Sequence, residues 1–127
     1  MLKRGKSYLA MIKHQILQLL GLVRRASQLT TGEGLVLNQI RHQTAKFVFI
    51  ASDAGVSTKK KFTDKCTFYK IPSCDVFSRQ EISQAIGQAR SVVAINNSGF
   101  AKKFQQLTKQ INEGEWAYGQ RTNLWIS

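Results

Sequence analysis

The feature that most constrains the fold is a pair of continuous apolar runs, AKFVFIASDAG at residues 45–55 and SVVAIN at residues 91–96. Both are rich in β-branched or aromatic residues, and turn-forming residues close the first. Strands that are apolar at successive positions are typical of a sheet whose two faces are both covered. We therefore expect two buried, parallel strands, the first of them central, with helices on either side.

The segments around these runs carry apolar residues at helical spacing. They predict helices at about residues 12–25, 33–42, 57–71, 78–87 and 100–111, and a further short strand at 75–77. Ser57 or Thr58 can cap the third helix, whereas Ser78 and Glu81 form a capping box for the fourth, which Gly87 ends. This alternation predicts an α/β fold: a single-domain, three-layer α/β/α sandwich with a small mixed sheet.

The two ends of the chain lie outside this periodic pattern. We expect a flexible N-terminal extension at 1–10, the folded domain at 11–113 and a C-terminal tail at 114–127. A chain of 127 residues suits one domain with a core of its own. Three aromatic residues fall in the tail, where we expect them to fold back onto the sandwich: Trp116, Tyr118 and Trp125.

The charge balance points to a polyanionic partner. Nineteen Lys and Arg residues stand against seven Asp and Glu residues, a formal net charge of +12, and eleven of the basic residues lie within residues 1–61. Nucleic acid is the first candidate and an anionic membrane surface the second. No apolar stretch is long enough for an export signal or a membrane span. Cys66 and Cys74 form no CxxC pair and have no histidine at ligand spacing, so we expect a reducing, cytoplasmic location and no metal or cofactor.

Catalytic signals are weak, and anion-binding signals are stronger. Asp53 is the only carboxylate directly after a central strand, and we interpret it as a turn or helix-cap residue. Lys59, Lys60 and Lys61 fall in the run STKKK, where we expect a helix N-terminus to form a phosphate cradle. Gly32 and Gly34 would allow close backbone approach to a ligand at the start of the second helix.

Several blocks of sequence resemble one known family in the same order along the chain. The blocks are LLGLVRRASQLTTGEGLVLNQIR, AKFVFIASDAGVSTKKKFTDKC, FSRQEISQAIG and RSVVAINNSGFAKK, within about residues 12–104. They are similar to the kink-turn RNA-binding family of large-subunit ribosomal proteins, and most of all to its bacterial YlxQ-type paralogues. The resemblance implies a sandwich without cofactor or catalysis, in which the start of the second helix and two adjacent loops hold RNA.

The family's contacts carry over to this sequence in part. Its motif has a glycine and a spacer, then Asn-Glu and, three residues on, a Lys. Gly32 matches, but Gly34, Leu35 and Asn38 take the other places. Together, the resemblance and the basic run STKKK predict an RNA-binding surface of ten residues: Gly32, Glu33, Gly34, Leu35, Asn38, Lys59, Lys60, Lys61, Arg79 and Arg90.

The sequence thus predicts a non-enzymatic protein that binds structured RNA, kink-turn-like or ribosomal, through a basic face. We expect a monomer with no membrane partner and no small-molecule substrate. Two alternatives stay open. One is a protein-interaction adaptor in the translation or RNA-processing machinery, and the other is a small α/β enzyme that uses Asp53.

Overall fold

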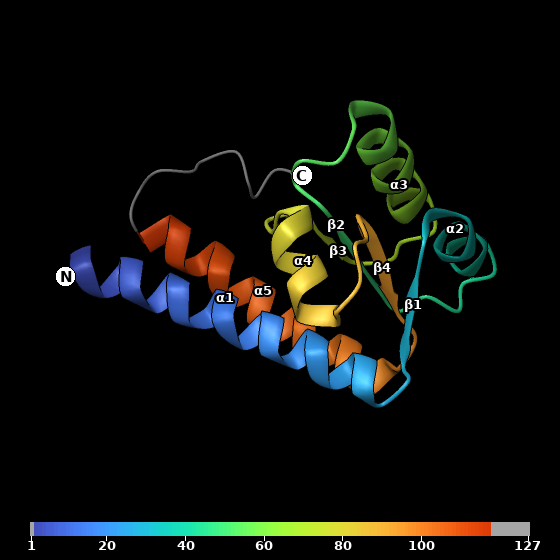
Figure 1. Ribbon diagram of the computed structural model, residues 1–127. Coiled ribbons are helices and arrows are strands. Elements are labelled where there is room, and N and C mark those ends of the chain that lie inside the picture. The colour runs from blue at the N-terminus through green and yellow to red at the C-terminus, as the bar shows by residue number, and fades with distance from the viewer. Residues whose placement is uncertain (1, 118–127) are drawn as a thin grey trace.

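The computed structural model describes residues 2–117 of the chain, and their side chains from residue 8 to residue 112 (Figure 1). The helices are α1 (Leu2–Arg25), α2 (Glu33–Arg41), α3 (Val56–Phe68), α4 (Arg79–Ile86) and α5 (Ser98–Ala117). The strands are β1 (Leu29–Thr31), β2 (Phe47–Ile50), β3 (Ser73–Cys74) and β4 (Val92–Ile95).

The strands form one mixed sheet in the order β1-β4-β2-β3. β2 and β3 are parallel, whereas β4 is antiparallel to both of its neighbours. The mixed sheet is confirmed, but the expectation that β2 and β4 run parallel is wrong. Helices cover both faces of both strands, and a run that is apolar at every position has the same pattern in either direction.

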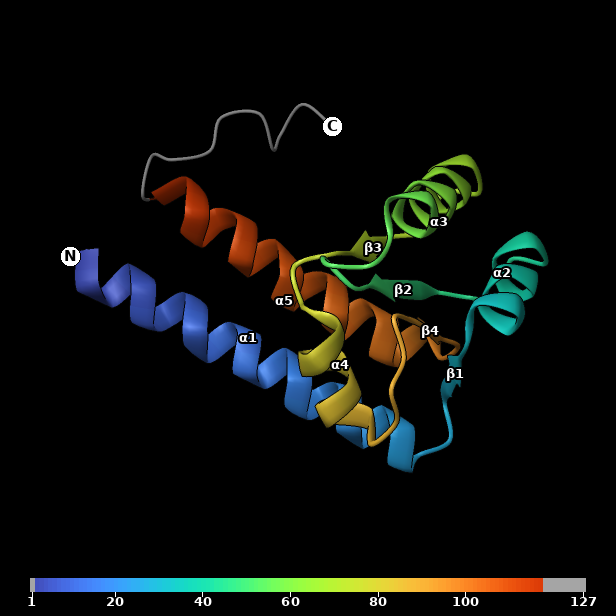
Figure 2. The same ribbon diagram turned by 45° about the horizontal axis from the view of Figure 1, so that its top comes forward.

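Helices cover the sheet in two layers, which confirms the three-layer sandwich. Phe47 and Phe49 point from β2 into a core shared with α1, α4 and α5, and the alternate residues Val48 and Ile50 point into a core shared with α2 and α3. Figure 2 shows α1 and α5 side by side on one side of the sheet and α2 and α3 on the other.

Both long helices extend beyond the expected domain limits. α1 begins at Leu2, so residues 2–10 are helical and are not a separate extension, and α5 continues to Ala117. The two helices pack against each other, and the Tyr8 hydroxyl donates to Gln110 Oε1 at 3.2 Å. Polar residues with adequate helix propensity can prolong a helix after its apolar pattern stops. The expected fold-back of the tail falls largely outside the described residues, as do Tyr118 and Trp125.

The predicted helix caps and strand limits are confirmed only in part. The capping box of Ser78 and Glu81 is present, and Gly87 ends α4 in the left-handed conformation with φ 77°. Gly55, and neither Ser57 nor Thr58, is the N-cap residue of α3. The strand expected at 75–77 lies two residues earlier, because β3 pairs with β2 through Ser73 and Cys74.

Candidate nucleic-acid interface

One end of the sheet gathers three connections that are distant in sequence. β1 and β2 end there and the antiparallel β4 begins there, since Thr31 pairs with Val93 and Ile50 with Val92. From this end, β1 leads into the start of α2 and β2 leads into the β2–α3 loop, whereas the α4–β4 loop leads into β4. We call this end of the sheet the loop edge. It comprises residues 31–35, 51–55 and 87–91 of these connections, together with residues 78–79 at the start of α4, where Arg79 bonds to Asp53 and Ser91.

Arg79 joins two of these connections. Its side-chain Nε donates to Ser91 Oγ at 3.0 Å, and its backbone N–H donates to Asp53 Oδ1 at 2.8 Å. Asp53 therefore acts as an acceptor for the first N–H of α4, as the helix-cap interpretation predicts. The arginine is exposed and borders an open hollow of about 540 Å³. The hollow is lined by Asp53, Arg79, Gln80, Ser83, Gln84, Gly87, Gln88 and Ala89.

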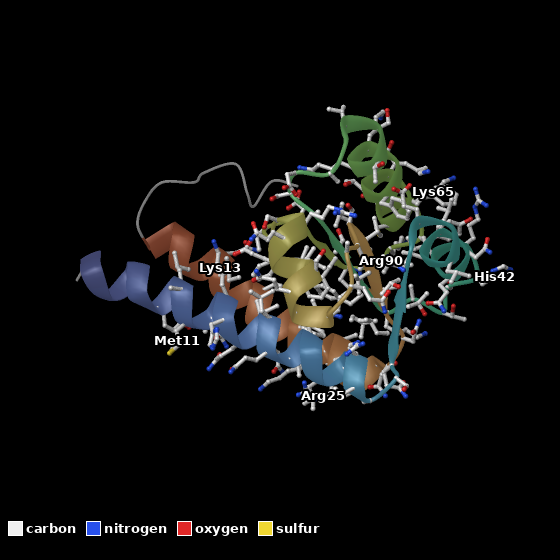
Figure 3. The ribbon with its side chains drawn as sticks, in the orientation of Figure 1. Met11, Lys13, Arg25, His42, Lys65 and Arg90 are labelled. Carbon is white, nitrogen blue, oxygen red and sulfur yellow. The ribbon has the colours of Figure 1, made fainter. Side chains whose placement is uncertain are left out.

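Arg90 joins the α4–β4 loop to the segment that precedes α2. Its Nε donates to Thr31 Oγ1 at 3.3 Å, its Nη1 donates to the Ala89 carbonyl at 2.9 Å, and its backbone N–H donates to Ser83 Oγ at 3.0 Å. The arginine is half-buried, and Figure 3 shows it near β1 and β4. Thr31 directly precedes Gly32, so the structure brings Arg90 beside the start of α2.

The start of α2 is open to solvent. Gly32 has φ 96°, a conformation that favours glycine, and a Cβ added at Gly32 or Gly34 would meet no atom within 4 Å. Leu35 is 63% exposed, whereas its neighbour Val36 is fully buried. Leu35 therefore offers an apolar surface at the loop edge and does not turn into the core.

The three lysines of STKKK do not gather into one cradle. Because α3 begins at Val56, they occupy its fourth to sixth positions, and their Nζ atoms reach three different elements. Lys59 donates to the Ser52 carbonyl at 3.2 Å and lies 3.9 Å from Asp75 Oδ2. Lys60 lies 3.0 Å from Asp64 Oδ2.

Lys61 alone of the three reaches α2, where its Nζ lies 3.7 Å from Glu33 Oε1. Each lysine thus has a carboxylate as its neighbour. These three contacts are the ion pairs found within the described residues. The side chains of Arg79 and Arg90 bond instead to uncharged oxygens, although the backbone N–H of Arg79 donates to the Asp53 carboxylate.

Arg24, in the last turn of α1, lies beside the loop edge and is not among the residues expected to contact RNA. An added Cβ on Gly87 would lie 3.6 Å from the Arg24 Cζ atom, so this guanidinium covers the start of the α4–β4 loop. Its position at the end of α1 is also favourable for the helix dipole. The hydroxyl groups of Thr31 and Ser91, which accept hydrogen bonds from Arg90 and Arg79, were not predicted from the sequence either. No local signal identifies these contacts, because each joins segments far apart in sequence.

The described part of the chain offers little support for metal chemistry. It holds no group of three or more His, Cys, Asp or Glu side chains that could bind a metal ion. Cys66 and Cys74 lie in the cores on opposite faces of the sheet, and burial raises the pKa of each thiol to about 11. Both thiols are therefore protonated at neutral pH. Of the described helices, none is long and apolar enough to cross a membrane.

Comparison with known proteins agrees with the resemblance. The model of the ribosomal protein L7Ae/L30e/S12e/Gadd45 family matches residues 14–105. An "RNA-binding protein YlxQ" of Enterococcus faecium is 45% identical over 102 residues, 80% of this chain and 95% of that protein. Its counterpart in Bacillus subtilis (strain 168) is 47% identical over 90 residues, 70% of this chain and 90% of that protein.

Solved structures have the same fold. A protein of unknown function from Bacillus halodurans C is 42% identical with a TM-score of 0.70, over 76% of this chain and 96% of that one. A Giardia lamblia 15.5kD RNA-binding protein has a TM-score of 0.65 at 17% identity, over 83% of this chain and 88% of that one, and shows the fold alone. The chain belongs to the ribosomal protein L7Ae/L30e/S12e/Gadd45 family.

Proposed function

We propose that this protein binds structured RNA at the loop edge and catalyses no reaction. The observation that carries the proposal is that Arg79 and Arg90 converge on the α4–β4 loop, with the guanidinium of each donating to a hydroxyl group. Arg79 reaches Ser91, and Arg90 reaches Thr31 beside the start of α2. A guanidinium held in this way keeps its full charge and further N–H donors for a phosphate. The relatives named RNA-binding proteins and the net charge of +12 support the same partner.

Structured RNA fits the loop edge better than duplex DNA or an enzyme substrate. A helix start and two loops on a rigid sheet can match the phosphate geometry of a bent or internally looped RNA. No exposed recognition helix is evident in the sequence for the major groove of DNA. Asp53 is engaged with the Arg79 N–H, which favours a positioning role over a catalytic one. We further propose that the protein acts as a cytoplasmic monomer on ribosomal or kink-turn-like RNA.

A binding assay with three polyanions tests this proposal. Filter binding at two salt concentrations would compare structured RNA, duplex DNA and heparin. We expect structured RNA to bind most tightly at both concentrations, and all affinities to fall with salt. Equal binding of the three polyanions at high salt would contradict the proposal, since it would leave net charge as the sole source of affinity.

The specificity of the site depends on three positions of α2. Sheared G·A pairs of a kink-turn present edges for directional hydrogen bonds, and a good bidentate contact discriminates by roughly 1–3 kcal/mol. Gly34 and Leu35 cannot make such bonds, although Leu35 offers an exposed apolar surface. We therefore infer that phosphate contacts dominate, and that a kink-turn and a mutant without its G·A pairs bind almost equally.

Competition between these two RNAs checks the inference. The triple variant Gly34→Asn, Leu35→Glu, Asn38→Lys restores the family pattern and should raise the preference for the intact kink-turn. All three positions are exposed, so the substitutions leave the core untouched. A strong preference for the intact kink-turn in the unmodified protein would show that other residues read the G·A pairs.

A further inference from the structure

A groove between α1 and α5 lies on the helical layer opposite α2 and α3. It has a volume of about 370 Å³ and an apolar floor of Leu19, Leu22 and Leu107, with Arg25 and Lys103 at its rim. Gln15 and Gln18 complete its lining. The RNA-binding proposal uses none of the residues that line this groove. The residues proposed to hold RNA lie on α2, α3, the start of α4 and the loop edge, with Arg24 at the end of α1 beside them.

The α1 side of the groove belongs to a longer exposed stripe. Its members are spaced alternately by three and four residues, the spacing that places them on one face of a helix, and all are exposed: Tyr8, Met11, Gln15, Gln18, Leu22 and Arg25. Met11 is 49% exposed and Leu22 is 45% exposed. Figure 3 shows Met11 and Arg25 along the same outer edge of α1, away from the sheet. The stripe runs for about 25 Å at the helical rise per residue.

The charge around the groove is of one sign. Neither α1 nor residues 98–112 of α5 contain an Asp or Glu, and Glu113 and Glu115 follow at the end of α5. The basic residues with described side chains in these two segments are Lys13, Arg24, Arg25, Lys102, Lys103 and Lys109. Exposed apolar residues at helical spacing, rimmed by basic residues, are complementary to a helix with an apolar stripe and acidic flanks. RNA would match the charge but would gain little from the leucine floor.

We propose that the groove between α1 and α5 docks an acidic amphipathic helix of a partner protein. The partner's apolar residues would pack against Leu22 and the leucine floor, and its carboxylates would face Arg25 and Lys103. Because this surface is separate from the loop edge, protein and RNA can bind at the same time. The docking proposal stands whether or not the chain binds RNA.

Two helical peptides of about three heptads test the proposal, measured by fluorescence anisotropy. Both carry leucine at positions a and d, and they differ only in having glutamate or lysine at positions e and g. We expect the glutamate peptide to bind and the lysine peptide to fail. Leu22→Glu, and the pair Arg25→Glu with Lys103→Glu, should each weaken binding by roughly tenfold or more.

Phe68→Glu is the matched control, since Phe68 is 75% exposed on α3 and lies outside the groove. It should leave peptide binding unchanged, and thermal melts should show that all variants are folded. Unaltered binding by the folded Leu22→Glu variant would overturn the proposal. Displacement of the peptide by structured RNA would assign the groove to RNA. Self-association that Leu22→Glu abolishes, with no peptide binding, would assign it to a second copy of the chain.

Discussion

Two groups of basic side chains, the lysines of α3 and the arginines around the α4–β4 loop, have similar formal charge but different surroundings. Each lysine of STKKK lies within 4.0 Å of a carboxylate oxygen, at distances of 3.9, 3.0 and 3.7 Å. The guanidinium groups of Arg79 and Arg90 instead donate to hydroxyl or carbonyl oxygens, and the carboxylate near Arg79, that of Asp53, accepts from its backbone N–H.

This difference shows that a cluster of charges in sequence is not the same as a positive surface. A nearby carboxylate offsets much of a lysine's potential at a phosphate, whereas a hydroxyl orients a guanidinium and leaves its charge uncompensated. The most conspicuous basic run of the sequence is therefore the weaker candidate for phosphate binding, and three scattered arginines are the stronger one.

The largest change in RNA binding should come from replacing all the basic residues of one group by alanine. For every phosphate that the protein no longer neutralises, the slope of log K against log salt falls by roughly 0.7–0.9. For the triple alanine variant of Arg24, Arg79 and Arg90 we expect a decrease of about two, and for that of Lys59, Lys60 and Lys61 a decrease of less than about one. RNA titrations at several salt concentrations measure both. A larger decrease in the lysine variant would reverse the order of the two groups.

A single arginine should account for much of this effect. Arg90→Ala removes a charge-assisted hydrogen bond to phosphate of about 1.5–3 kcal/mol, which corresponds to roughly a ten- to hundredfold weaker RNA affinity. It should also lower the free energy of unfolding by about 0.5–1.5 kcal/mol, because the hydrogen bond to Thr31 disappears. Lys109→Ala, an exposed basic residue on α5, is the control for charge alone. Full affinity in Arg90→Lys would mean that the guanidinium geometry is not used.

Removing the carboxylate that pairs with Lys61 should raise the affinity for RNA. Glu33→Gln removes the partner of Lys61 and a negative charge at the start of α2, so RNA affinity should increase about two- to fivefold, with a free-energy change close to that of an exposed ion pair. Loss of the acidic residue from the first turn should cost about 0.3–1 kcal/mol of stability. Isothermal titration and thermal melts separate the two effects. An unchanged affinity would place Lys61 outside the RNA surface.

The smallest effect should follow from Lys60→Ala. Lys60 pairs with Asp64 one helical turn away, and both side chains are largely exposed. Such a pair contributes about 0.3–0.5 kcal/mol to the free energy of unfolding. We expect RNA affinity to change less than about twofold, since Lys60 is exposed and lies outside the loop edge. A loss as large as that of Arg90→Ala would show that the carboxylate does not screen this lysine.

The sequence by itself determined the layered architecture and several local features. Continuous apolar runs identified β2 and β4 as buried strands, and the capping box at Ser78 with Gly87 located α4, because these signals act within a few residues of one another. The ordered blocks of resemblance identified the family, and the position of Asp53 after a strand favoured a capping role that the Arg79 N–H bears out.

The tertiary structure alone decided the direction of β4, the outward orientation of Leu35 and the partners of Arg79, Arg90 and Lys61. An apolar strand has no direction in its pattern, so pairing with β2 had to set it. The contacts of Arg90 with Thr31 and of Lys61 with Glu33 join residues far apart in sequence. Electrostatic and hydrogen-bond energies depend on distances in space, and those distances exist only once the chain has folded.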